Sequence, residues 1–357
     1  MKIFVSEYLT SGAWGDGSMP DSLLCEGRSM LAAIVADFAR IENCRVLTTW
    51  DRRLGQPRSP NLSEAGNGIK VIAVDNPSDE RATFRRLAAD SDATYVIAPE
   101  FDGILAERCR LVIDCGGRLI GPTPQAIELC ADKLALANHL ERHDIPTIPT
   151  QSFAVELSVD SLSYPAVIKP RDGAGSLDVF LIRDRSEALG IREQFPAGRP
   201  HGSAIMQPYV EGESLSVSAI VSSHDRIDVF PAGVQCLSQD GRFRYLGGQI
   251  PAASVNARHV EELIRRTCAS IPGLRGYVGF DLIQTHATPH RLLIVEINPR
   301  LTTSYLGYRA LTDDNLAERM LFPDRALRAI DWKKKLISFE PDGSVRAESL
   351  PCSSRVE

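Results

Sequence analysis

The first 120 residues alternate between short apolar runs and longer segments with helical periodicity. The short runs predict strands at residues 3–5, 46–48, 71–74, 95–98 and 118–120. Between them, residues 23–39, 80–89 and 104–115 carry apolar side chains at helical spacing, and Asp21 or Ser22 can cap the first of these helices. Strands that alternate with helices in this way predict a parallel α/β sheet of Rossmann type.

This pattern ends at residues 121–124, where a Gly-Pro-Thr-Pro sequence interrupts it. Residues 125–143 predict one long helix, which the prolines at 146 and 149 end. Antiparallel strands are then predicted at residues 166–169, 179–182, 204–207, 215–221 and 227–234, with covering helices at 185–194 and 260–270. The second part is therefore expected to be α+β. Residues from 340 onward are polar, and we expect a frayed tail there.

The most informative polar residues lie on a strand near the C-terminal end. An apolar run at residues 292–297 contains Glu296 and leads into Asn298 and Arg300. Glu296 and Asn298 are two apart, so they share one face of a strand. Residues 277–284 predict a second strand, and the short loop at 285–290 allows a hairpin that puts Asp281 one diagonal step from Glu296. Hard divalent cations prefer such oxygen ligands, although a polar patch on a half-exposed strand would show the same residues.

Composition narrows the class of protein. The chain has 357 residues, enough for two or three domains, and its net charge of -6 offers no basic stripe for nucleic acid. Its eight cysteines lack CxxC spacing, so they read as reduced thiols of a cytosolic protein rather than as a zinc site. Apolar runs stay shorter than the ~20 residues that cross a bilayer. We expect a cytoplasmic protein with no nucleic-acid or membrane partner.

A second set of residues suits a phosphate-bearing ligand. The strand that ends at Lys169 runs into a Gly-rich loop with Asp172, Gly173, Ala174, Gly175 and Ser176. Lysine supplies a point charge for phosphate, and glycines let backbone N–H groups approach it closely. No Gly-Lys dipeptide occurs, so the loop is not of the Walker A type. Taken alone, the loop could equally be a hairpin turn.

The loop at residues 10–20 follows the first predicted strand and carries Trp14 and Asp16. Loops at the carboxyl ends of parallel strands commonly bind ligands. Its glycines do not form GxGxxG, so a dinucleotide fingerprint is absent. The loop is a candidate substrate-binding element, and a plain surface loop is an equal alternative.

In their order along the chain, these elements resemble the ATP-grasp superfamily. The order is Lys133, then Lys169 with the Gly-rich loop, a strand that leads to a Glu-rich turn, Asp281, and the Glu-x-Asn-Pro-Arg sequence from Glu296. The resemblance covers essentially the whole chain. It implies a Rossmann-like pre-ATP-grasp domain at residues 1–121, a first ATP-grasp subdomain with the Gly-rich loop at 122–203, a second with the metal site at 204–339, and a tail at 340–357.

The resemblance also implies a role for each residue. Lys133 and Lys169 would contact the nucleotide, together with the Gly-rich loop. Adenine would be held by Gln207 and the backbone of Tyr209 and Val210, and ribose by Glu211 or Glu213, a choice that the spacing after Gly212 leaves open. The implied cofactors are ATP and two Mg²⁺ or Mn²⁺ ions, held by Asp281, Glu296 and Asn298. Catalysis would rest on Arg300 and Lys169.

The sequence Glu-Ile-Asn-Pro-Arg-Leu-Thr-Thr-Ser-Tyr-Leu-Gly from Glu296 resembles a narrower group, the tyramine–glutamate ligases of methanofuran-type cofactor biosynthesis. This implies substrate contacts from Arg300, Thr302, Thr303 and Ser304, although the hydroxyl run could instead form a strand-end turn. The implied activity is ATP-dependent amide formation between glutamate and a phenolic amine, such as tyramine or tyrosine, through an acyl phosphate. The implied partners are small-molecule carboxylate and amine substrates, and a second copy of the chain in a homodimer. A non-catalytic ATP-binding regulator and an ATP-grasp carboxylase are the alternatives.

Overall fold

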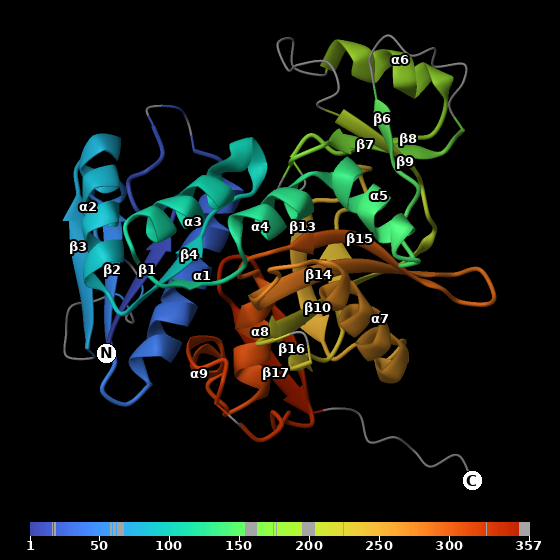
Figure 1. Ribbon diagram of the computed structural model, residues 1–357. Coiled ribbons are helices and arrows are strands. Elements are labelled where there is room, and N and C mark those ends of the chain that lie inside the picture. Colours follow the sequence, from blue (N-terminus) through green and yellow to red (C-terminus); the bar gives the residue numbers. More distant parts are fainter. Residues whose placement is uncertain are drawn as a thin grey trace.

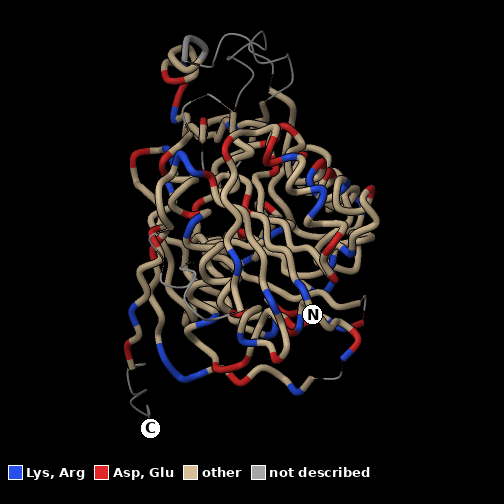
Figure 2. Tube along the Cα trace, turned by 90° about the vertical axis from the view of Figure 1, so that its left-hand side faces the viewer, with Lys and Arg blue, Asp and Glu red and all other residues tan. Residues whose placement is uncertain are grey.

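The computed structural model describes residues 1–15, 17, 19–57, 59, 62, 68–153, 163–173, 175, 177–194, 204–223, 225–325 and 327–349. Within these ranges the chain forms an N-terminal α/β domain, a small antiparallel sheet and a large antiparallel sheet (Figure 1). Lys and Arg are interspersed with Asp and Glu over the described trace (Figure 2). None of the described helices is long and apolar enough to span a membrane.

The N-terminal domain is the predicted Rossmann-type sheet. Its five parallel strands lie in the order β3-β2-β1-β4-β5. The strands are β1 (Lys2–Glu7), β2 (Arg45–Asp51), β3 (Ile69–Val74), β4 (Ala93–Ile97) and β5 (Leu119–Ile120), and the helices are α1 (Asp21–Ala39), α2 (Pro77–Asp90) and α3 (Ile104–Asp114). Short 3-10 helices occupy Arg52–Leu54 and Phe101–Gly103. β1 and β4 are almost entirely buried, which explains their continuous apolar character.

The single helix predicted at residues 125–143 is wrong. Two helices occupy this segment, α4 (Pro124–Ala131) and α5 (Lys133–Arg142), and Asp132 between them has a non-helical backbone. The Asp132 carboxylate accepts hydrogen bonds from the backbone N–H groups of Leu134 and Ala135, at 3.1 and 3.0 Å. This N-cap stabilises a new helix start. The break places Lys133 at the start of α5, where its backbone N–H donates to Arg171 O at 3.0 Å.

The small sheet has the antiparallel order β6-β9-β7-β8 and carries α6 (Arg185–Gln194). Its strands are β6 (Gln151–Phe153), β7 (Ala166–Pro170), β8 (Phe180–Ile182) and β9 (Ala204–Pro208). β7 delivers Lys169 from its C-terminal end and lies beside β9, which ends at Gln207 and Pro208. The predicted strand segments of this sheet are confirmed.

The large sheet has the order β15-β14-β10-β12-β13-β16-β17, with β11 paired to β10. Its strands are β10 (Gly212–Val221), β11 (Ile227–Val229), β12 (Gly233–Leu237), β13 (Tyr245–Ile250), β14 (Gly276–Thr285), β15 (Leu292–Asn298), β16 (Lys335–Phe339) and β17 (Val345–Ser349). The remaining helices are α7 (Ala257–Ser270), α8 (Ser304–Leu311) and α9 (Leu316–Leu321).

Two predictions for the large sheet are corrected. The strand predicted at 227–234 is divided into β11 and β12 around Pro231, which has no N–H for a ladder hydrogen bond. The tail predicted from residue 340 instead contains β17, which pairs antiparallel with β16 from Lys335 to Phe339. All five side chains of β17 are exposed, so backbone pairing rather than apolar burial holds this strand in place. Residues 350–357 lie outside the described ranges.

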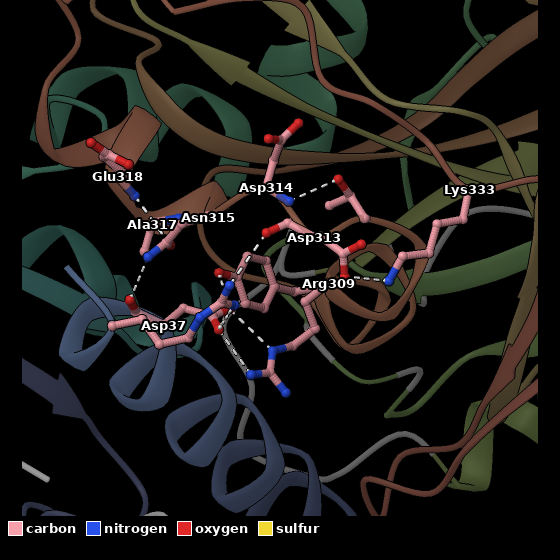
Figure 3. Close-up of polar contacts among 11 residues, drawn as sticks. Asp37, Arg309, Asp313, Asp314, Asn315, Ala317, Glu318 and Lys333 are labelled. Carbon is pink, nitrogen blue, oxygen red and sulfur yellow. Dashed lines mark hydrogen bonds and ion pairs between the residues drawn. The ribbon is translucent and has the colours of Figure 1, made fainter.

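Helices α8 and α9 join the large sheet to α1 of the N-terminal domain. The buried Asp37 carboxylate of α1 accepts hydrogen bonds from Tyr305 Oη at 2.8 Å and from Arg309 Nη2 at 2.8 Å (Figure 3). Asn315 Nδ2 donates to the Asp37 carbonyl oxygen at 2.8 Å. One apolar cluster continues across the same contact, from Phe38 to Tyr305 and Phe339. Because α8 begins at Ser304, this contact holds the segment after Arg300 against the N-terminal domain.

Candidate active site

A cavity of about 280 Å³ lies between the small sheet, the large sheet and α1. Residues far apart in the sequence meet on its wall. The predicted site residues among its lining are Lys133, Lys169, Gly173, Gly175, Gln207, Tyr209, Val210, Asp281, Glu296, Asn298, Arg300, Thr302, Thr303 and Ser304. The cavity therefore brings together most of the residues that the sequence suggested for one site.

The β14–β15 hairpin places two carboxylates side by side. Asp281 lies directly opposite Glu296, closer than the predicted diagonal, because a bulge at Val295 moves its partner from Val295 to Glu296. Both oxygens of Asp281 accept hydrogen bonds, from Gln235 Nε2 at 2.7 Å and from Asn298 Nδ2 at 3.1 Å. Burial, together with the neighbouring Glu296 charge, raises the pKa of Asp281 to about 7.

Two lysines offset this negative charge. Lys133 Nζ lies 3.3 Å from Glu296 Oε1 and donates to the Gly173 carbonyl oxygen at 2.7 Å. Burial would raise the pKa of Glu296, but the charges of Lys133 and Lys169 outweigh it and hold the pKa below its usual value. Burial lowers the pKa of Lys169 to about 8. A site with buried ammonium groups beside the Gly-rich loop suits the oxygens of a phosphate chain.

The donors fit a hard divalent cation that arrives with a phosphate-bearing ligand. Among the described residues, no group of three or more His, Cys, Asp or Glu side chains could hold a metal ion by itself. Asp281, Glu296 and the Asn298 amide oxygen are nevertheless the oxygen donors that Mg²⁺ accepts. A cation between the two facing carboxylates would relieve the repulsion that raises the pKa of Asp281. Phosphate oxygens would complete the coordination shell.

The opposite end of the cavity suits a planar base. Tyr209 stacks on Phe243 with ring centroids 6.2 Å apart, and both rings line the cavity with the apolar Val167. Gln207 lines it too, and its Nε2 donates to Thr150 Oγ1 at 2.8 Å. The Tyr209 N–H already donates to the Pro165 carbonyl oxygen at 3.0 Å. The backbone N–H of Tyr209 is therefore already engaged within the protein.

Arg300 lies at the border with the N-terminal domain. Its Nε lies 2.8 Å from Glu100 Oε1, and its Nη2 donates to Glu100 Oε2 at 2.9 Å. The hydroxyls that follow Arg300 are also bonded: Thr302 to Tyr277 at 3.2 Å, Thr303 to Glu26 at 2.9 Å, and Ser304 to Ser216 at 3.4 Å. The residues described at this end of the cavity therefore combine the Arg300 guanidinium, the hydroxyls of Thr302, Thr303 and Ser304, and the carboxylates of Glu26 and Glu100.

Family comparison agrees with this arrangement. The family model described as ATP-grasp domain matches residues 130–304, and the one described as pre ATP-grasp 3 domain matches residues 44–127. The chain belongs to the ATP-grasp superfamily. Along the chain, the first match ends and the second begins within α4, at residues 127 and 130.

Curated ATP-grasp relatives match most of the chain. The tyramine–L-glutamate ligase of Methanocaldococcus fervens is 26% identical over 89% of this chain and 92% of its own length. That of Methanocaldococcus jannaschii is 23% identical over 87% and 86%. A solved structure, of a putative ATP-grasp superfamily protein from Archaeoglobus fulgidus, has a TM-score of 0.67 at 22% identity, and covers 94% of this chain and 92% of that one. This structural likeness supports the ATP-grasp fold.

Some predicted residues do not reach the ATP-grasp cavity. Asp172 Oδ2 accepts a hydrogen bond from the Asp102 N–H at 3.2 Å, at the border with the N-terminal domain. Glu211 is exposed, and Glu213 accepts a hydrogen bond from Ser254 Oγ, so neither lines the cavity. Their proposed contact with ribose stays a prediction. Ala174 and Ser176 of the Gly-rich loop, and Asp16 of the loop at 10–20, lie outside the described residues.

Sequence reasoning missed several polar residues at or beside the cavity, among them Gln235, Glu100 and Glu26. Glu100 follows β4, and the carboxyl end of a parallel strand is where ligands commonly bind, so its position gave a usable signal. Gln235 lies on β12, whose place beside β10 the sequence does not reveal. Glu26 lies within α1 and looks like any polar helix residue until the fold brings it to Thr303.

Proposed function

We propose that this protein is an ATP-dependent ligase that joins a carboxylate to an amine. One observation carries the proposal: a single cavity holds the charged groups for a nucleotide and its metal at one end, and Arg300 with a row of hydroxyls at the other. These two parts of the cavity adjoin where β15 leads into the segment from Arg300 to Ser304. A γ-phosphate at the first end would therefore lie next to an acid at the second.

The reaction has two steps. A carboxylate oxygen attacks the γ-phosphorus of ATP, the bond to the β-phosphate oxygen breaks, and ADP and an acyl phosphate form. The amine nitrogen then attacks the acyl carbon, the carbon–oxygen bond to phosphate breaks, and one amine proton leaves with the phosphate. Phosphoryl transfer of this kind depends on positioning and charge neutralisation.

This chain's residues supply that positioning. Lys133 and Lys169 would hold the phosphate chain, beside the backbone of Gly173 and of Gly175 on the cavity wall. Arg300 lies where charge develops on the acyl and phosphoryl oxygens. Two Mg²⁺ or Mn²⁺ ions held by Asp281, Glu296 and Asn298 would neutralise the β- and γ-phosphates.

For the substrates, we propose glutamate as the acid and a phenolic amine, tyramine or tyrosine, as its partner. The support comes from the relatives above, which are tyramine–L-glutamate ligases and which the chain matches over most of their length. Thr302, Thr303 and Ser304 line the cavity wall beside Arg300, where the acid would lie. The product would belong to methanofuran-type cofactor biosynthesis.

The test is a substrate screen by coupled ADP release with Mg²⁺, with products identified by mass spectrometry. We expect ADP and an amide in equal amounts from glutamate with tyramine or tyrosine. ATP binding without ADP release from any acid and amine would contradict the ligase and favour a regulator. ADP release that requires bicarbonate would favour a carboxylase instead. Light scattering of the purified protein would test the expected homodimer.

A further inference from the structure

Glu26 is a cavity-lining carboxylate that the proposed reaction has not yet used. It lies near the start of α1 and faces the same cavity as Lys169 and Glu296. The same end of α1 packs closely against the Gly-rich loop, because a Cβ on Gly175 would lie only 2.6 Å from Leu23 Cδ2. α1 therefore forms the wall that the N-terminal domain contributes to the cavity.

The charge of Glu26 has no cationic partner among the described residues. Its Oε2 accepts a hydrogen bond from Thr303 Oγ1 at 2.9 Å, and a hydroxyl is neutral. Arg300 acts on Glu26 electrostatically, but Glu100 already holds Arg300 with two contacts. A carboxylate in a confined site costs free energy unless a cation or several hydrogen-bond donors neutralise it. The Glu26 carboxylate is therefore suited to bind a positively charged group of a ligand.

The surroundings of Glu26 suit an ammonium on an organic substrate rather than a metal ion. Tyr245 of β13 lines the same cavity, and burial together with the charges of Glu26 and Asp281 raises the pKa of Tyr245. An aromatic ring beside a carboxylate suits an organic cation, since the ring face attracts positive charge. The carboxylates of the metal site, Asp281 and Glu296, belong instead to the part of the cavity that holds both lysines.

We propose that Glu26 binds the ammonium group of the amine substrate and thereby selects a primary amine as the acceptor. The inference rests on the ligase function proposed above. Thr303, which bonds Glu26, is three residues from Arg300 on one short segment. An ammonium held by Glu26 therefore lies beside the acyl phosphate that Arg300 faces. One ammonium proton passes to the Glu26 carboxylate, and the neutral amine nitrogen then attacks the acyl carbon while the carbon–oxygen bond to phosphate breaks and a second proton leaves with the phosphate.

The test compares wild type with Glu26→Gln, which keeps the size of the side chain and removes its charge. Tyramine is varied at saturating ATP and glutamate, and each of these is then varied in turn. We expect the KM for tyramine to rise at least about tenfold, with the KM for ATP and for glutamate unchanged, because one charge-assisted contact is lost. The exposed Glu42, just after α1, provides the matched control Glu42→Gln, which should leave every constant unchanged.

A second measurement does not depend on turnover. Calorimetry in the presence of ADP and Mg²⁺ compares tyramine with 4-ethylphenol, which lacks the amine. Wild type should bind tyramine more tightly, and Glu26→Gln should bind the two alike. Glu26→Asp retains the charge on a shorter side chain and should recover part of the tyramine preference, a result that a folding defect would not produce.

The outcomes separate the two proposals. If wild type forms the amide and Glu26→Gln has the same KM for tyramine, the proposed role of Glu26 is overturned. The proposed ligase function would then still stand. A rise confined to the KM for glutamate would also overturn it, because Glu26 would then hold the acid. Charge-dependent tyramine binding without amide formation from any acid would overturn the ligase reaction alone.

Discussion

Glu100 holds Arg300 through two contacts, with Nε–Oε1 at 2.8 Å and Nη2–Oε2 at 2.9 Å. Glu100 follows β4 in the pre-ATP-grasp domain, and Arg300 follows β15 in the ATP-grasp domain. The side chains are only 6% and 14% exposed, so water screens the pair little. Glu100 of the pre-ATP-grasp domain therefore orients the Arg300 guanidinium of the ATP-grasp domain. In the proposed reaction, positioning of the acyl group would then depend on the contact between domains as well as on Arg300.

Glu100→Gln removes one charge of this pair and keeps its shape. We expect kcat to fall about 10- to 100-fold, because Arg300 loses the contact that orients it. ATP affinity should stay unchanged, since in the proposed site Lys133 and Lys169 would hold the phosphates and Glu100 contacts neither. Steady-state ADP release and calorimetry measure the two quantities. Glu107→Gln is the matched control, since it breaks an exposed ion pair with Arg81 in the same domain. Unchanged kcat in Glu100→Gln would contradict a positioning role.

Glu296→Gln should abolish turnover while the fold stays intact. The substitution removes one of the two facing carboxylates that suit the metal, and Lys133 keeps its hydrogen bond to the Gly173 carbonyl oxygen. ADP release measures activity, and circular dichroism verifies folding. ADP release close to the wild-type rate would refute the assignment of Glu296 as a metal ligand.

Lys169→Ala should weaken ATP binding by about 10- to 100-fold, because a buried ammonium beside the phosphate site is lost. Calorimetry with a non-hydrolysable ATP analogue measures the affinity directly. Lys70→Ala, at an exposed position on β3, serves as the comparison and should bind as wild type does. Equal affinities in all three proteins would count against a phosphate role for Lys169.

Asp281→Asn should stabilise the metal-free protein at alkaline pH although it abolishes activity. Burial and the Glu296 charge raise the folded-state pKa of Asp281 to about 7, from 3.8. Protonation of Asp281 contributes its full stabilisation to the folded state below about pH 4. This contribution to the free energy of unfolding is lost as the pH rises to 7. The variant carries no such loss. Its free energy of unfolding should gain on the order of 2 kcal/mol relative to wild type between pH 5 and 8.

Urea unfolding in EDTA at several pH values measures this difference. A constant difference between the variant and wild type from pH 5 to 8 would show that the pKa of Asp281 is not raised. Addition of Mg²⁺ with ATP should stabilise wild type more than Asp281→Asn, because the variant lacks one of the carboxylates that suit the metal.

Asp37→Ala should lower the free energy of unfolding by about 2 kcal/mol or more, since it leaves Tyr305 and Arg309 without their buried acceptor (Figure 3). Urea titration measures the loss. Asp324→Ala, at an exposed position, should change stability by less than about 0.5 kcal/mol. A neutral Asp37→Ala would mean that apolar packing alone holds α8 on α1.

The sequence alone determined the elements that depend on neighbours along the chain. The alternation of strands and helices identified the N-terminal sheet, since apolar periodicity is a local property. The order of Lys133, Lys169, Asp281 and Glu296 pointed to the ATP-grasp superfamily before any contact was known. Local pattern failed at Asp132, where a capping side chain divides a run with continuous helical spacing.

Only the tertiary structure decided which polar groups share the cavity. The bulge at Val295 sets Asp281 directly against Glu296, and the sequence carries no separate sign of that register. Glu100 meets Arg300 across 200 residues, and Glu26 meets Thr303 across 277. Contacts at such separations follow from how whole sheets and helices pack, so no local pattern encodes them. The sequence alone indicated the nucleotide chemistry, whereas the packing of α1 and β4 on the second domain placed Glu26 beside Thr303 and Glu100 beside Arg300.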